Sequence, residues 1–479
     1  MNETPKRLSR RDFLAAATAA TGAAILAACG GSSATETPKA AATVAGVAAT
    51  TAPLATAGGA AATTAPAPAA SAAGGASATT TTNTAAGGKA PTGAINYWHH
   101  FTSDTEMKGL ERITTTFKTQ YPGVTVTQEN IPNASYMQKF TAAVQAKSLP
   151  DTVMVSAERV NDMVAMNGLK DLTERINNST LKKDLPDNRW TAATVNGKTY
   201  GVPAFMFVNW MYYRADWFKE AGITAPPKTW AEFQDIAVKL TDPAKNRFGF
   251  GLRGGDGGEG WVEMMLRAFG SPIVDDKGKP AMDVAKATEG LKYYTELFTK
   301  YKVAPPSAPN DSYAQVMTAF KTGQTGMVLH HTGSLKEVRD ALGDKFMTAP
   351  YPAGPAAHIA DVTPLYNGLS QTIKDDRGDA GWAWITQWTT PDAEIALLEE
   401  TGYFPASIAA ANDSRVTGNP LYKAATDTLT FGTLPPQFNG GSGWLKQSVL
   451  PTFQKVLLGQ ATPAQGVDQM NADLKKATS

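Results

Sequence analysis

Hydrophobic and polar positions follow two alternating periods over residues 95–168. Short apolar runs at 95–98, 124–126 and 153–155 are typical of buried strands. Between them, apolar residues recur every three or four positions, first at Met107, Leu110, Ile113 and Phe117 and then at Tyr136, Phe140 and Val144. Strands that alternate with helices of this length predict an α/β layer with parallel strands.

The same alternation returns in the second half of the chain. Strands are expected at 248–252 and 327–329, and helices at 261–269, 286–301 and around Val316 and Phe320. A further helix is predicted over 382–398. No repeat is short enough for a solenoid. The chain of 479 residues therefore predicts two or more lobes, each with its own core.

The N-terminus carries an export pattern. Arg10 and Arg11 form the pair of a twin-arginine signal, followed by an apolar stretch at 14–28 that is short for a bilayer span of about 20 residues. Small residues then lead into Cys29, the only cysteine of the chain, and the segment 26–29 resembles a lipobox. We expect Cys29 to be diacylated after cleavage; the alternative is a small buried hydrophobic residue.

Residues 30–92 consist almost entirely of Ala, Thr, Gly, Ser and Pro and contain no aromatic residue. Such a segment cannot bury enough apolar surface to offset the entropy of ordering, so it is predicted to be a flexible tether. No later apolar run is long enough to cross a membrane. The pattern predicts an extracytoplasmic protein that is attached to the cell membrane only through its lipid.

Charge and cysteine content exclude several classes of protein. The formal net charge of +1, without a dense Lys/Arg stripe, argues against nucleic-acid binding. A single cysteine excludes an intrachain disulfide and a cysteine-based zinc cluster. No Gly-x-Ser-x-Gly or His-Glu-x-x-His motif is present, so an exported hydrolase is the less favoured alternative.

Several motifs occur in order along the chain: Trp98-His99, Tyr200 to Pro203, Tyr212 to Phe218, Ala221 to Ile223, Pro227 to Trp230, Ala319 to Gln324, and Thr401 to Ala406. Together they resemble the family 1 extracellular solute-binding proteins, which serve ABC importers of sugars. The resemblance covers residues 93–479. Arg214 stands where that family usually has Asn.

The resemblance implies a two-lobed periplasmic-binding-protein fold, type II-like, in which parallel-sheet lobes are joined by a hinge that the chain crosses more than once. The hinge would pass near 204–205 and 361–362, and lobe closure on the solute would be sensed by the permease. The implied limits are 1–28 for the signal peptide, 29–92 for the lipidated cysteine and tether, 94–204 with 362–412 for lobe one, and 205–361 with 413–479 for lobe two.

Candidate ligand residues follow the strands, because ligands of open parallel sheets bind beyond the carboxyl ends of the strands. Sugars present apolar faces and hydroxyl edges, which suit aromatic platforms beside polar groups. The candidates are Trp98, His99, His100, Arg253, Asp256, Glu259, Trp261, His330, His331 and, at a lobe crossover, Asn367. The two tryptophans could instead be core residues, and the charged residues could be solvated.

Trp444 is a further candidate platform. It follows the glycine-rich run 440–443, so we expect few side chains to pack around it, and it matches the region where related proteins place a stacking aromatic residue. Six other tryptophans are expected in the core: Trp210, Trp217, Trp230, Trp382, Trp384 and Trp388.

The sequence predicts neither a metal nor a cofactor. Adjacent histidines on a strand point to opposite faces, so neither His pair chelates one ion easily. The loop 254–260 lacks the Gly-Lys-Ser/Thr ending of a P-loop. The expected partners are a sugar and the transmembrane permease of an ABC importer. The protein itself is expected to be a monomer. A phosphorylated polyol such as glycerol 3-phosphate stays open as the ligand, since Trp98-His99 also resembles relatives that bind it.

Cys29→Ala should abolish membrane attachment and leave the folded lobes intact, because the tether separates the lipid from the fold. Metabolic labelling with a fatty acid and membrane fractionation measure this in parallel with a melting curve. Acyl label on the variant, or an unmodified Cys29 in the mature wild type, would contradict the prediction.

Overall fold

The computed structural model describes residues 90–478. The predicted twin-arginine signal, the lipidated Cys29 and nearly all of the tether lie outside these residues. Among the described residues, no helix is both long and apolar enough to cross a membrane.

The first lobe begins with the three predicted parallel strands. β1 (Gly93–His99) lies between β2 (Val124–Asn130) and β3 (Thr152–Ser156) and pairs in parallel with both. The connections are α2 (Asp104–Gln120) and α3 (Asn133–Ala146), as the helical spacing predicted. These crossovers place the loops after β1 and β3 at the same edge of the sheet.

α2 shows how the sequence sets a helix boundary. Ser103 is the N-cap and forms a capping box with Glu106, whose carboxylate accepts the Ser103 backbone N–H. Leu110, Ile113 and Phe117 are buried as expected. Met107 is 40 % exposed, so it does not belong to the buried stripe.

The second lobe contains the parallel pair β7 (Phe248–Gly251) and β8 (Thr325–His331). Helices α9 (Glu259–Ala268), α10 (Val284–Thr299) and α11 (Tyr313–Lys321) connect them. The remaining helices of this region are α7 (Ala215–Glu220), α8 (Trp230–Leu240), α12 (Leu335–Leu342), α18 (Gly441–Trp444), α19 (Leu450–Leu457) and α20 (Pro463–Ala477).

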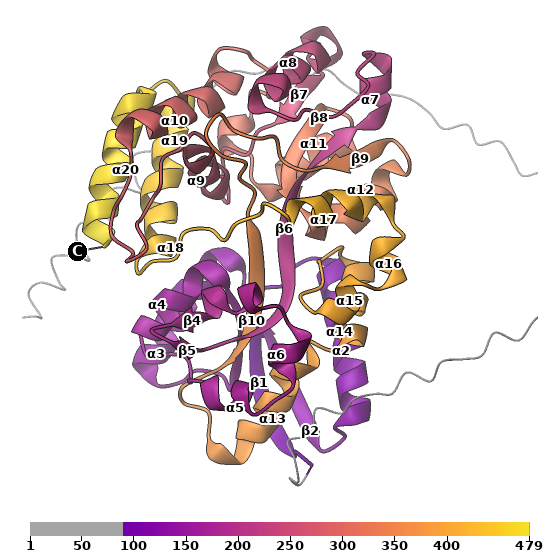
Figure 1. The fold of residues 1–479 in the computed structure, drawn as a ribbon, viewed down its shortest axis with the longest axis vertical. Helices are drawn as coiled ribbons and strands as arrows, with labels where there is room; N and C mark the ends of the chain where they lie inside the picture. The colour runs from indigo at the N-terminus through magenta and orange to yellow at the C-terminus, as the bar shows by residue number, and fades with distance from the viewer. Residues whose placement is uncertain (1–89, 479) are drawn as a thin grey trace, which may run out of the picture. The chain divides into compact units, whose positions relative to one another are not determined.

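Two long strands carry the chain between the lobes (Figure 1). β6 (Val202–Arg214) pairs with β10 (Val362–Leu369) through its first half and with β8 and β9 (Phe346–Ala349) through its second half. All of these pairings, and that of β10 with β3, are antiparallel. The strand order is β2-β1-β3-β10-β6-β8-β7, with β9 also on β6.

This architecture confirms the predicted two-lobed α/β fold and its multiple crossovers. The antiparallel crossing strands were not anticipated, because the strand–helix alternation indicates only the parallel pairs. The residue limits given above for the two lobes stay predictions.

The predicted helix over 382–398 is wrong in one respect, since it is two helices. α13 (Asp375–Gln387) ends before Trp388, and α14 (Pro391–Glu400) starts anew with Thr390 as its N-cap. Pro391 has no backbone N–H, so it cannot continue the first helix but fits the first turn of the second.

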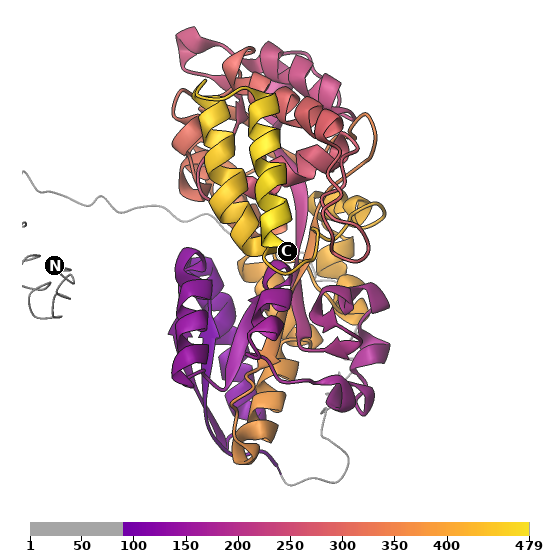
Figure 2. The ribbon, with the colours of Figure 1, turned by 90° about the vertical axis from the view of Figure 1, so that its left-hand side faces the viewer.

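Shorter elements complete the chain. They are α4 (Val160–Ala165), α5 (Thr173–Asn177), α6 (Leu181–Asp184), the hairpin of β4 (Thr194–Val195) and β5 (Lys198–Thr199), α15 (Ile408–Ala411), α16 (Ser414–Thr417) and α17 (Lys423–Thr428). Figure 2 shows α19 and α20 side by side in yellow, packed together as their contacts require.

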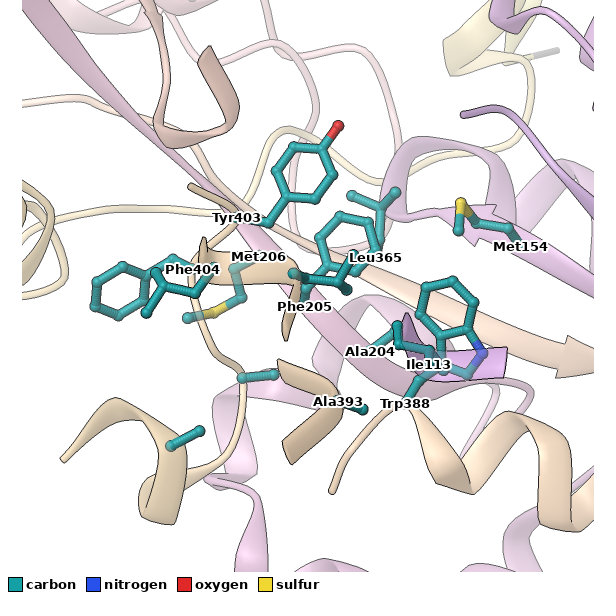
Figure 3. Packing of buried hydrophobic residues seen from close by; sticks show 14 of the residues in the cluster. Ile113, Met154, Ala204, Phe205, Met206, Leu365, Trp388, Ala393, Tyr403 and Phe404 are labelled. Atoms are coloured by element: carbon teal, nitrogen blue, oxygen red, sulfur yellow. The ribbon is translucent and has the colours of Figure 1, made fainter. Parts of the chain in front are cut away.

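Three clusters of buried side chains form the core. One surrounds α9, α10, α19 and α20, and a small one lies between β3 and α3. The third extends from α2 and α13 across β6 to β8 and α11, and Figure 3 shows its centre around Phe205, Tyr403 and Trp388. Trp210, Trp217, Trp230, Trp384 and Trp388 are buried as predicted, whereas Trp382 is only half-buried.

A buried ionic network lies where the chain crosses between the lobes. Arg267 of α9 donates to both oxygens of Glu263, to the carboxylate of Asp361 and to Oγ1 of Thr433. Asp361 precedes β10 and accepts the Asn209 N–H of β6 through its carbonyl oxygen, while Val362 N–H donates to the Thr433 carbonyl oxygen. Arg267 therefore connects α9 with Asp361 at the start of β10 and with the segment that contains Thr433.

Arg267→Met should lower the free energy of unfolding by about 3–5 kcal/mol, because it leaves two buried carboxylates without their cation. Thr433→Val removes only one neutral acceptor and should cost about 1 kcal/mol. Urea denaturation of both variants measures the difference. Equal, small losses for the two would contradict the assigned role of the arginine.

Candidate functional site

A series of aromatic rings joins the lobes at the carboxyl ends of β1 and β8. The series, here the junction cluster, consists of Phe101, Phe205, Phe207, His331 and Tyr403. Phe205 and Tyr403 stack with centroids 4.6 Å apart, and Phe207 and His331 stack at 4.2 Å. Phe101 packs against Phe205 and Tyr403 at 5.8 Å each. Phe207 and His331 are only partly buried, so their stack is the accessible part of the cluster.

Two carboxylates flank the junction cluster, and tyrosine hydroxyls bond both. Tyr403 donates its hydroxyl to Glu106, the capping residue of α2. Tyr313 of α11 donates to Glu337 of α12, which also forms an ion pair of 2.7 Å with Lys321. Burial is the main cause that raises the pKa of Tyr403, and the charge of Glu106 raises it further. Glu106 also contributes to the raised pKa of Tyr313. The two hydrogen-bonded pairs are therefore close neighbours.

The histidine pair at the end of β8 is neutral. Burial lowers the pKa of His331 to about 3, and the positive charge of Arg253 adds to this effect. Burial likewise lowers the pKa of His330, with His331 and Arg253 contributing. His331 Nδ1 accepts the Gly333 N–H at 3.1 Å, which fixes it as an acceptor. These rings can offer an apolar face and hydrogen bonds at neutral pH.

The lobe-two candidates come together around His330. Trp261 stacks on His330 with centroids 6.0 Å apart and donates its indole N–H to the Tyr351 hydroxyl at 2.8 Å. The Arg253 guanidinium lies over the Trp261 ring, with its Cζ 5.2 Å from the ring centroid. Asp256 and Glu259 are both held by Lys446, at 2.6 Å each. Asp256 is exposed and Glu259 is buried.

The lobe-one candidates are also closely packed. His99 is 1 % exposed, and its Nδ1 accepts the Phe101 N–H. Burial lowers its pKa to about 4. His100 lies edge-on to Phe101 and Tyr136, and burial together with Arg159 lowers its pKa to about 3. His100 Nδ1 is a buried polar atom with no hydrogen-bond partner among the described residues.

Trp98 and Asn367 lie in the lobe-one core. Trp98 packs with Ile131 and Tyr136 in the cluster between β3 and α3, and Lys139 Nζ lies 4.7 Å from its ring. Asn367 is fully buried in β10 and accepts the Tyr97 hydroxyl at 2.8 Å. Their packing favours structural roles, and contact with a ligand stays a prediction for both.

The expectation that few side chains surround Trp444 is wrong. Trp444 is 3 % exposed, lies near Phe438 and donates its indole N–H to the Met470 carbonyl oxygen at 2.8 Å. The glycine run lets α18 lie close to α20, which supplies this packing. The run itself reaches lobe one, where the Gly440 N–H donates to the Asp162 carboxylate at 2.7 Å.

Sequence reasoning missed several residues of the junction. Tyr403 lies within one of the recognised motifs, and Glu106 completes a Ser-x-x-Glu capping box, so both had a signal. Phe207 had none, since β6 is apolar on both faces and no period marks the accessible position. Tyr313 and Glu337 become neighbours only through the packing of α11 on α12. Within residues 90–478, no group of three or more His, Cys, Asp or Glu residues could hold a metal.

The sequence and the fold match known proteins. Residues 102–395 match the family of bacterial extracellular solute-binding proteins, and the chain belongs to that family. The maltotriose-binding protein of Pyrococcus abyssi is 24 % identical over 359 residues, which are 72 % of this chain and 74 % of the relative.

Two solved structures share the fold. An ABC transporter solute-binding protein from Thermotoga lettingae, bound with α-D-tagatose, has a TM-score of 0.73 at 21 % identity and covers 80 % of this chain and 99 % of its own. UgpB from Mycobacterium tuberculosis, in complex with glycerophosphocholine, has a TM-score of 0.70 at 19 % identity, with 81 % and 98 % covered. These likenesses confirm the predicted family resemblance and the two-lobed fold.

Trp444→Ala should cost about 3–5 kcal/mol of folding stability, as for truncation of a large core side chain. This reverses the expectation from the glycine run, under which the melting temperature would hardly change. Trp382→Ala, at a half-buried position, should cost clearly less. A melting curve of the ligand-free variants decides; an unchanged melting temperature for Trp444→Ala would restore the platform interpretation.

Proposed function

We propose that this chain is the extracytoplasmic solute-binding lipoprotein of an ABC importer, and that it captures a sugar or oligosaccharide at the lobe junction and presents it to the permease. The observation that carries this proposal is the accessible stack of Phe207 on His331, at 4.2 Å, between two hydrogen-bonding tyrosine–carboxylate pairs. A sugar ring needs this combination of an apolar platform and polar edge groups.

The hinge supports a binding cycle. β6 and β10 connect the lobes as continuous strands, and Phe207 lies on β6 while His331 ends β8. A solute that contacts both lobes gains contacts only when they close, so binding favours the closed form. The permease would distinguish this form from the open one. The names of the relatives, which include maltotriose and tagatose among their ligands, agree with a sugar.

Binding rather than catalysis is proposed for the two junction carboxylates. Each already accepts a tyrosine hydroxyl, and Glu337 is also paired with Lys321. These partners give both carboxylates a hydrogen-bonding role, and the sequence supplies no recognised nucleophile–base motif beside them. Incubation with oligosaccharides would test this directly, since a binding protein returns them unchanged.

A phosphorylated polyol is the second candidate ligand. It is favoured by Arg253, which no carboxylate pairs among the described residues. The structural likeness to UgpB, solved with glycerophosphocholine, points the same way. We further propose attachment through lipid on Cys29 and a monomeric state.

Phe207→Ala should weaken sugar binding by about 0.5–1.5 kcal/mol, that is by about two- to twelvefold, because it removes the platform partner of His331. Calorimetric titration with maltotriose, mannitol and sn-glycerol 3-phosphate measures this, after a thermal-shift screen of the same compounds on the wild type. At 100 times its dissociation constant, a true ligand stabilises by about 2.7 kcal/mol.

Phe298→Ala is the matched control, since Phe298 is also half-buried but lies on α10. Binding that is equally weakened in both variants would reflect general destabilisation. If no sugar or polyol stabilises the wild type, the proposed solute class is wrong.

A further inference from the structure

Arg253 is held in one position by the loop that follows β7. Its Nε donates to the Asp256 carbonyl oxygen at 2.6 Å, and its guanidinium faces the Trp261 ring. Gly257 lies against the other side of the side chain. A Cβ on Gly257 would lie 2.0 Å from Arg253 Nη2 and 2.3 Å from Cζ, so the guanidinium occupies the space that any other residue would fill. Gly257 also has φ +88°, which disfavours other residues.

The loop's own acids do not neutralise Arg253. Lys446 approaches from the segment after α18 and bonds Asp256 and Glu259 at 2.6 Å each. No ion pair in residues 90–478 joins Arg253 to a carboxylate, and one hydrogen bond uses one of its five N–H donors. Burial lowers the pKa of Arg253, with Glu259 and Asp256 acting in the opposite direction. An arginine nevertheless stays charged in proteins.

Apart from Glu259 and Asp256, which Lys446 pairs, the groups that interact with Arg253 are neutral. Besides Trp261, they are His330, His331, Tyr313 and Tyr294, all of which interact electrostatically with its charge or contribute to its pKa. The histidine pKa values are depressed, so neither ring adds a positive charge, and the charge of Lys446 is paired with Asp256 and Glu259. A partly buried guanidinium that forms no direct ion pair keeps free N–H donors, and a bound oxyanion can accept them.

We propose that Arg253 is an oxyanion subsite beside the aromatic platform, which takes the carboxylate or phosphate of an acidic sugar or polyol, and that Gly257 and Lys446 are its positioning residues. This rests on the proposed function, since the platform binds the rest of the solute. The planar guanidinium can bond two oxygens of such a group at once. Of the two junction carboxylates, Glu337 is paired with Lys321, whereas Glu106 keeps its charge and accepts the Tyr403 hydroxyl.

Calorimetric titration of the full chain with five probes tests the proposal: D-glucuronate, sn-glycerol 3-phosphate, inorganic phosphate, D-glucose and glycerol. We expect glucuronate or glycerol 3-phosphate to bind at least about tenfold more tightly than its neutral counterpart, as hydrogen bonds to a charged group would give. Which of the two binds distinguishes a carboxylate from a phosphate source. Inorganic phosphate should compete with the winner.

Variants separate position from charge. Arg253→Gln should remove the preference for the oxyanion, and Gly257→Ala should weaken it several-fold by displacing the guanidinium. Gly260→Ala is the matched control, since a Cβ there meets nothing within 4 Å, and it should bind as the wild type does. Arg253→Lys keeps the charge without the fork and should retain part of the preference.

A second readout does not depend on the ligand. Because Arg253 depresses the pKa of both His330 and His331, Arg253→Gln should raise these values in an NMR titration, whereas Gly260→Ala should not. Equal binding of neutral and acidic probes, no binding of either acidic probe, or an unshifted histidine titration would overturn the subsite. Tight binding of glucose in the first case would leave the proposed sugar function standing.

Discussion

Arg267 lies where the chain passes between the lobes, and its four buried contacts determine how those passages are arranged. Without a cation at this position, Glu263 and Asp361 would face each other in a space from which water is excluded. Burial and Asp361 already raise the pKa of Glu263, against the opposing effect of Arg267. Because two buried acids share one guanidinium, small displacements of these segments change the electrostatic energy steeply.

α9 connects this network to the ligand side of the lobe. Trp261 and Arg253's loop lie at its first turn, and Arg267 lies in its last turn. Trp261 and Arg267 are six residues apart, which is about 9 Å along a helix axis. One helix therefore carries, at one end, Trp261 and the loop of Arg253 and, at the other, the arginine that holds the crossing segments. The loop of Arg253 and the Arg267 network are therefore linked by a single helix rather than by a chain of side chains.

The sequence was most informative where local rules decide the outcome. The period of the apolar positions gave the helices and parallel strands, and Ser103 and Pro391 explain helix boundaries because caps and proline act over a few residues. Candidate loops were found because strand ends are local features too. Pairing across long distances in sequence was not predictable, since nothing in β6 or β10 encodes an antiparallel neighbour. Trp444 shows the limit most clearly: three glycines in the four preceding residues indicate a bare loop locally, yet α20, which follows later in the chain, covers the indole.

The shared strands also constrain how the protein can be assembled. β10 supplies the neighbour of β3 in lobe one, and it lies more than 200 residues after that strand. Lobe one therefore cannot complete its sheet until most of lobe two has been synthesised, and the edge of β3 stays unpaired in the meantime. Contacts of such high sequence separation slow folding and prolong the exposure of strand edges. The shared strands β6 and β10 thus make the two lobes a single kinetic unit of folding, in which neither lobe folds alone.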